Sequence, residues 1–174
     1  YNSLLPYWWA AIFENVDLSN SDYNLSDFTI YGNTQRQSPD LYYGYSEANK
    51  VSYKDVVFDE AELIVRGRGS YCELHDLNIR KGQDWARGDI AFASKRDEVK
   101  SPVSIRLDME AQFPLAEAAK LFKSNIATVI TDFKTTSTPL IQLEAAIFNK
   151  AYSEYEDKSY IDLSADLDHP LTYN

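Results

Sequence analysis

The sequence predicts a mostly β (α+β) fold, a twisted, open antiparallel sheet of about eight strands joined by hairpins, with two amphipathic helices. Three observations lead to this prediction. Short runs of alternating apolar and polar residues follow one another from Tyr42 onward. Turn residues separate these runs, and only two segments carry helical periodicity. Parallel neighbours would need crossovers of about a dozen residues, so the short connections favour an antiparallel meander.

The chain begins with the first predicted helix. Apolar residues recur every three or four positions over Leu5–Val16, and Pro6 suits a first helical turn. After a polar break, Phe28 and Ile30 alternate with less apolar neighbours up to the turn signal Gly32-Asn33. We expect one strand to end there.

Four strands joined largely by tight turns are predicted next. The segments 67–70 and 81–84 have the length and the glycines of hairpin turns. The apolar register slips between Leu74 and Leu77, which predicts a β-bulge at His75-Asp76. The four predicted strands are Tyr42–Lys54, Ala61–Arg68, Tyr71–Arg80 and Trp85–Ser94.

The remaining elements are the most regular. Val103–Phe113 alternates strictly, so one side of this strand is expected to be dry and the other wet. Leu115–Phe133 then switches to the helical period, with a possible break near Ser124-Asn125. Two more one-sided strands follow at 141–147 and 161–167. Two helices cannot cover a sheet of this size, so we expect part of the apolar face to stay open as a binding groove.

Composition excludes several classes of protein. The chain carries 17 Lys and Arg against 27 Asp and Glu, a formal charge of −10 with both histidines neutral, which argues against binding nucleic acid or anionic lipid headgroups. Cys72 is the only cysteine, which excludes a disulfide scaffold, and its place on a strand beside Leu74 favours a buried residue. Nucleophile, phosphate-loop and dinucleotide motifs are absent, so the chain is predicted not to be an enzyme and no cofactor is expected.

We interpret residues 1–174 as a single β-rich segment of a longer, repeat-built protein. The chain starts at Tyr1 without an initiator methionine or signal peptide, so any membrane anchor is expected outside it. A helix, a polar link and a strand occur twice, and the tetrapeptides beginning at Val51 and Leu171 are offset by 171 − 51 = 120 residues. Possible repeat units are therefore 1–114 and 115–174, the second one truncated.

Two further constellations allow alternative interpretations. His75-Asp76 could be half of a metal site completed by His169 with Asp166 or Asp168, whereas the bulge explains the same residues without a metal. Tyr42, Tyr43 and Tyr45 could form a platform that stacks sugars, although cross-strand tyrosines are commoner. We expect neither a catalytic nor a metal site.

Several segments together resemble the AsmA-like (TamB-like) family of bacterial envelope proteins. They are Leu5–Trp9 through Asp27–Gly32, Val51–Asp59, Leu74–Arg80 and Ala86–Ile90. The resemblance implies a long, curved antiparallel sheet with a hydrophobic groove, anchored in the inner membrane and extending through the periplasm. It also implies a role in phospholipid transport and outer-membrane biogenesis, with no catalytic residues.

The groove positions that the resemblance implies are apolar residues on the three C-terminal strands. They are Val103, Ile105, Leu107, Met109, Ile141, Leu143, Ile147, Ile161, Leu163 and Leu167. The expected function is therefore non-enzymatic shelter of phospholipid acyl chains, with neighbouring repeats of the same longer chain as partners and no nucleic acid. Two alternatives remain open, namely a surface adhesion or glycan-binding module and a structural spacer without a ligand.

Overall fold

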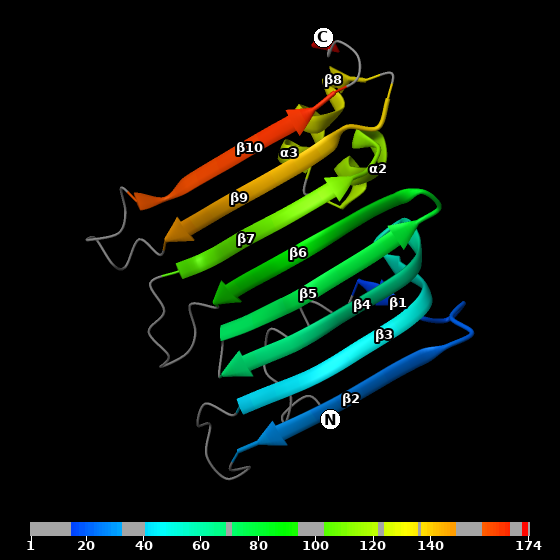
Figure 1. The fold of residues 1–174 in the computed structure, drawn as a ribbon, viewed down its shortest axis with the longest axis vertical. Coiled ribbons are helices and arrows are strands. Elements are labelled where there is room, and N and C mark those ends of the chain that lie inside the picture. Colours follow the sequence, from blue (N-terminus) through cyan, green and yellow to red (C-terminus); the bar gives the residue numbers. More distant parts are fainter. Residues whose placement is uncertain are drawn as a thin grey trace.

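The computed structural model describes residues 15–32, 41–68, 71–93, 103–121, 124–135, 137–148, 158–167 and 172–173. A nine-stranded antiparallel sheet has the order β1-β3-β4-β5-β6-β7-β9-β10, and β2 pairs with β3 beside it (Figure 1). The strands are β1 (Val16–Asp17), β2 (Asn24–Tyr31), β3 (Leu41–Tyr53), β4 (Val56–Arg68), β5 (Tyr71–Lys81), β6 (Asp84–Ala93), β7 (Val103–Gln112), β9 (Leu140–Phe148) and β10 (Tyr160–Asp166). The predicted open antiparallel sheet is confirmed.

The first predicted helix lies almost wholly outside the described residues. Its last residue, Val16, is not helical, because it pairs with Tyr53 in the short ladder between β1 and β3. The end of this prediction is therefore wrong, since ladder hydrogen bonds to β3 replace the helical ones at this point.

The second predicted helix is broken near Ser124, as the sequence indicates, but it ends before Phe133. It is divided into α2 (Leu115–Lys120) and α3 (Ser124–Thr131), and Phe133 belongs to a short strand, β8 (Phe133–Lys134). The Lys54 ammonium group donates a hydrogen bond to the Leu121 carbonyl, which satisfies an acceptor at the end of α2 without another helical turn. Both helices lie at one end of the sheet, beyond β7 and β9 (Figure 1).

Two hairpin turns connect the middle strands. Lys81 pairs with Asp84 around Gly82, whose φ is +61°, as the turn residues predict. The turn before β4 was missed, because Lys54 takes a φ of +52° without a glycine to signal it. Strand β4 therefore begins at Val56, five residues before the predicted start at Ala61.

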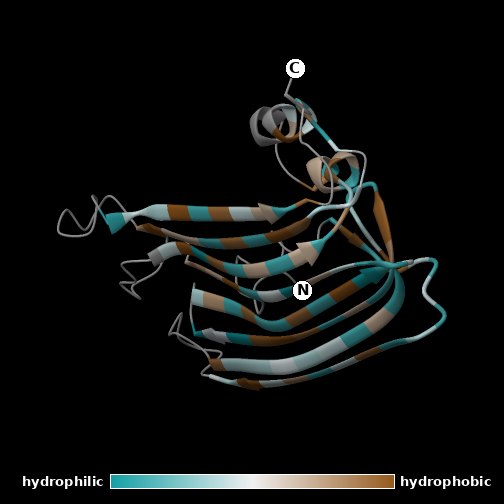
Figure 2. Cartoon of the chain, turned by 45° about the horizontal axis from the view of Figure 1, so that its top comes forward, coloured by the Kyte–Doolittle hydropathy of each residue, from teal (hydrophilic) through white to brown (hydrophobic). Residues whose placement is uncertain are grey.

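The pairing register gives the sheet one apolar and one polar face. Residues directly opposite each other point to the same side, so rows of side chains run across the strands. The colours along the strands alternate accordingly in Figure 2. One apolar row crosses eight strands through Phe28, Gly44, Val65, Leu74, Ile90, Leu107, Ala145 and Ile161.

Two buried clusters form the core on the apolar face. Tyr42, Val65 and Cys72 pack together on β3, β4 and β5. Cys72 is completely buried, which confirms the prediction of a buried cysteine, and this burial raises the pKa of its thiol to about 12. The second cluster, Val56, Phe58 and Phe113, is joined by Ala118 and Leu121, so α2 covers the apolar face at this end of the strands.

Two short ladders lie at corresponding places of the predicted repeat units, but only one strand of each ladder has the predicted offset. Tyr53 and Ser52 pair with β1, and Tyr173 and Thr172 of β11 (Thr172–Tyr173) pair with β8. Tyr173 and Tyr53 differ by 173 − 53 = 120 residues, the offset between the two tetrapeptides, whereas their partners Phe133 and Val16 differ by 133 − 16 = 117 residues. The division of the chain into repeat units stays a prediction.

Candidate functional site

The expected groove residues come together on the three C-terminal strands of the sheet. Ile105 lies opposite Ile147, Leu107 is in one row with Ile161, and Met109, Leu143 and Leu163 form the next row. We call the following residues the apolar strip: Ile105, Leu107, Met109, Ile141, Leu143, Ile147, Ile161 and Leu163. Of the remaining predicted positions, Val103 pairs with Phe148 across a register shift, and Leu167 is half-buried just after β10.

The apolar strip is open to solvent, unlike the same rows nearer the middle of the sheet. Ile161 and Leu163 on β10 are 68% and 63% exposed, and Ile105 and Ile147 are 39% and 38% exposed. The other members of the strip are half-buried and none is buried. On β4 the same apolar row contains Val65, which is completely buried. The apolar face therefore changes from core to open surface between β4 and β10.

The three-tyrosine platform is contradicted by the structure. Tyr42 is buried on the apolar face, whereas Tyr43 alternates to the other face, where it lies opposite Arg66 and is 50% exposed. Tyr45 shares that polar face, and its hydroxyl donates to Glu47. Successive residues of a strand point to opposite faces, so three closely spaced tyrosines on β3 cannot form one stacking surface.

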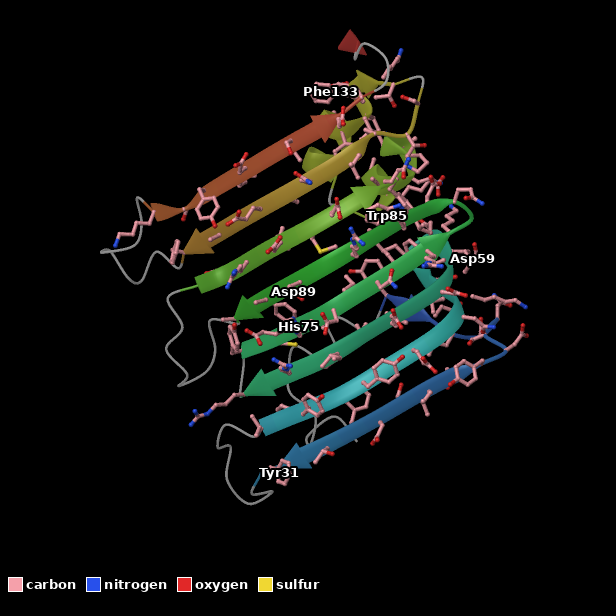
Figure 3. The ribbon with its side chains drawn as sticks, in the orientation of Figure 1. Tyr31, Asp59, His75, Trp85, Asp89 and Phe133 are labelled. Atoms are coloured by element: carbon pink, nitrogen blue, oxygen red, sulfur yellow. The ribbon has the colours of Figure 1, made fainter. Side chains whose placement is uncertain are left out.

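The predicted bulge at His75-Asp76 is confirmed. The β5–β6 register shifts between Leu74 and Leu77, and Asp76 takes a φ of +51°. The bulge places His75 against Asp89 of β6, with 2.6 Å between His75 Nδ1 and Asp89 Oδ1 (Figure 3). The same oxygen accepts a hydrogen bond of 2.9 Å from the backbone N–H of Asp76.

His75, Asp76 and Asp89 could hold a metal ion, a combination that differs both from the expectation of no metal site and from the alternative site with His169. Their ligand atoms lie within 4.8 Å of one another. Asp166 is excluded as a partner of His75, because β10 lies four strand spacings from β5, about 19 Å at ~4.8 Å per strand. His169 and Asp168 lie outside the described residues. For brevity we call His75, Asp76 and Asp89 the bulge cluster.

Sequence reasoning missed Asp89, although a signal was present. The turn pairs Lys81 with Asp84, and each step back along β5 pairs with one step forward along β6. Continued from Lys81 in this way, the register places position 76 near position 89. The predicted turn and the predicted bulge would together have brought Asp89 to His75. The two features were treated separately, so the contact across the hairpin was not anticipated.

A polar hollow of about 1050 Å³ lies beside the bulge cluster. Its lining comes mainly from the polar face of β5, β6 and β7 and includes Asp76, Asp89, Asp108 and Glu110. Arg87 closes part of it, since its guanidinium group lies 4.8 Å from the Trp85 ring centre and 2.5 Å from Glu110 Oε2. The hollow is thus built from charged groups, on the face opposite the apolar strip.

A row of four carboxylates crosses this polar face. Asp89, Asp108, Glu144 and Asp162 lie directly opposite one another on β6, β7, β9 and β10. None of the ion pairs among the described residues involves Asp108, Glu144 or Asp162. Like charges in opposite positions repel, so the row is a line of negative charge, with Arg87 and Arg106 on the same face on either side of it.

No family model, curated protein or solved structure matches this chain. The resemblance to AsmA-like proteins therefore stays a prediction. Neither of the two described helices has the length and hydropathy of a transmembrane segment.

Proposed function

We propose that the apolar strip binds the acyl chains of a phospholipid, and that the chain is a non-enzymatic, lipid-transporting segment of a cell-envelope protein of the AsmA-like kind. The observation that supports this proposal most is the exposure of Ile161 and Leu163, 68% and 63%, within an otherwise continuous apolar face. Exposed apolar surfaces of this kind are typical of binding sites. In this proposal the chain works in the periplasm and serves outer-membrane maintenance.

The size of the apolar strip suits an extended aliphatic ligand. From Ile141 to Ile147 on β9 the strip is about 20 Å long at ~3.3 Å per residue. It crosses β7, β9 and β10, which lie about 4.8 Å apart. The strip presents branched aliphatic side chains and Met109, whereas the charged residues of the same strands are on the other face.

Binding would be driven by partition rather than by headgroup recognition. Each methylene group that leaves water contributes about 0.8 kcal/mol, so several methylenes along the strip suffice for measurable affinity. The net charge of −10 opposes an anionic headgroup, which agrees with a contact through the acyl chain. Movement along the protein would then need only an apolar surface that continues in a neighbouring repeat, reached through segments outside this chain.

The first experiment compares charges placed on the two faces of the same strands. Lipids that co-purify with the chain are measured by mass spectrometry for the wild type, Leu143→Asp and Leu163→Asp. The controls are Gln142→Asp and Ser164→Asp, which add the same charge to the adjacent position on the polar face. We expect the two leucine variants to lose most of the bound lipid and the controls to keep it.

The same measurement decides between the proposal and a structural spacer. A spacer without a ligand predicts no stoichiometric lipid on the wild type. Equal lipid content in Leu143→Asp and Gln142→Asp would show that binding is not on the apolar strip. Circular dichroism of each variant checks that the sheet remains folded.

A further inference from the structure

We infer that the bulge cluster is a zinc site on the polar face, in which His75 and Asp76 are the protein ligands and Asp89 orients His75. This site is separate from the apolar strip, because the two lie on opposite faces of the sheet. The inference rests on three distances within the bulge cluster and on the charge of its surroundings.

The first step is the state of the imidazole ring. His75 Nδ1 lies 2.6 Å from Asp89 Oδ1, so in this inference the ring proton is on Nδ1, next to the carboxylate. A neutral histidine carries one ring proton, so Nε2 is then left with a free lone pair. Histidines that bind zinc are commonly held in this way, with the second nitrogen donating to a carboxylate.

The second step is the separation of the two proposed ligand atoms. His75 Nε2 lies 3.7 Å from Asp76 Oδ2. Two ligands bound to one tetrahedral zinc ion at ~2.1 Å are about 3.4 Å apart. A shift of a few tenths of an ångström therefore brings both atoms onto one ion, and waters complete the coordination.

The third step is the way in which Asp89 holds both ligands. Its Oδ1 lies 2.6 Å from His75 Nδ1 and accepts a hydrogen bond of 2.9 Å from the Asp76 backbone N–H. One carboxylate thus positions the imidazole ring and the backbone that carries the second ligand. The bulge is essential here, because it places two residues of β5 opposite one residue of β6.

The surroundings favour a cation. Asp108 lies directly opposite Asp89, and Glu144 and Asp162 continue the row of carboxylates. Imidazole combined with carboxylate suits zinc, whereas magnesium and calcium prefer sites built from oxygen alone. We therefore expect selectivity for zinc over magnesium.

The inference is tested by isothermal titration calorimetry of the purified full chain with zinc chloride. We expect one zinc ion per chain in the wild type and no saturable binding of magnesium. His75→Ala and Asp76→Asn should each abolish zinc binding. Asp76→Asn removes the charge and still tolerates the positive φ of the bulge, so it is informative even if His75→Ala is unstable.

Two further variants separate this site from its alternatives. Asp89→Asn should leave the stoichiometry at one and weaken the affinity by about 10- to 100-fold, as for other residues that orient a zinc-binding histidine. His169→Ala replaces the only other histidine and should bind zinc like the wild type. The absence of saturable zinc binding, or binding that is lost with His169 and kept without His75, would overturn the inference.

Discussion

At the scale of single residues, Glu47 shows how the polar face uses its tyrosines. Its carboxylate accepts hydrogen bonds from the hydroxyl groups of Tyr23 and Tyr45. These two bonds, with that from Tyr23 the larger effect, lower the pKa of Glu47. The bond to Glu47 in turn raises the pKa of Tyr45 to about 12, because ionisation would remove the donated proton and place a second negative charge beside the carboxylate.

The pH dependence of this contact is a direct prediction. Because the pKa of Tyr45 is higher in the folded chain, the stabilisation is complete below pH 10 and is lost as the pH rises through about 12. Glu47→Gln should move the pKa of Tyr45 from about 12 toward 10, as followed by NMR of ¹³C-labelled tyrosine. Glu73→Gln is the control, because Glu73 pairs with Tyr71 instead. A Tyr45 titration that is the same in both variants would contradict this prediction.

At the scale of elements, Gly88 allows β6 and β7 to pair beside the bulge. Its φ is +141°, and a Cβ atom at this position would lie 2.0 Å from the Asp108 carbonyl oxygen. Gly82 in the preceding turn also has a positive φ, +61°, but a Cβ there would meet nothing within 4 Å. Gly88 is thus required both by its backbone conformation and by the lack of space for a Cβ atom, whereas Gly82 is required by its backbone conformation alone.

This difference predicts unequal costs for two similar substitutions. Gly82→Ala should lower the free energy of unfolding by about 1 kcal/mol, the cost of the left-handed conformation. Gly88→Ala should lower it by more, about 3 kcal/mol, because the backbone of β7 must also move. Urea denaturation of both variants gives the comparison. Equal losses would show that the approach of Gly88 to β7 does not matter for stability.

The α2 helix illustrates how long-range contacts set the limits of an element. Its Glu117 carboxylate pairs with Lys120 on the same helix and with Lys81 at the end of β5, and these two lysines lower the pKa of Glu117. The helical period of the sequence continues past Leu121, but the bond from Lys54 meets the helix end there. Contacts from β3 and β5 thus place α2, and a local pattern contains no information about them.

At the scale of the whole molecule, the described sheet ends in two unpaired edges. Strand β2 pairs only with β3 and strand β10 only with β9 in the part of the chain that the structure describes. Exposed apolar side chains on an edge strand favour pairing with another sheet. Strand β10 combines both properties, since Ile161 and Leu163 are its most exposed large apolar residues.

We therefore expect weak self-association through β10. Sedimentation velocity over a range of concentrations should show an increase in the average sedimentation coefficient of the wild type. Ile161→Lys should reduce that increase, because a charge on an edge strand opposes pairing. Ser164→Lys adds the same single charge to the polar face of β10 and is the control. An equal effect of both substitutions would assign the association to net charge.

Some features of this fold could be predicted from the sequence pattern, and others could not. The alternation in β7, β9 and β10 predicted both their existence and their common apolar face, and the bulge at His75 followed from a slip in the same alternation. The turn at Lys54 was missed, because its positive φ is carried by a residue that seldom adopts it. The prediction of a tyrosine platform was wrong because successive residues of a strand point to opposite faces of the sheet, so Tyr42 and Tyr43 cannot lie on one surface.

The sequence by itself determined the antiparallel sheet, its two unlike faces and the burial of Cys72, because these depend on local alternation and on turn residues. The tertiary structure alone decided where the apolar face stays open and which residues meet across the sheet. The contact between His75 and Asp89 joins two strands through a bulge, and the exposure of Ile161 depends on what packs over β10. Both are properties of pairing and packing between distant segments, which a periodic pattern does not encode.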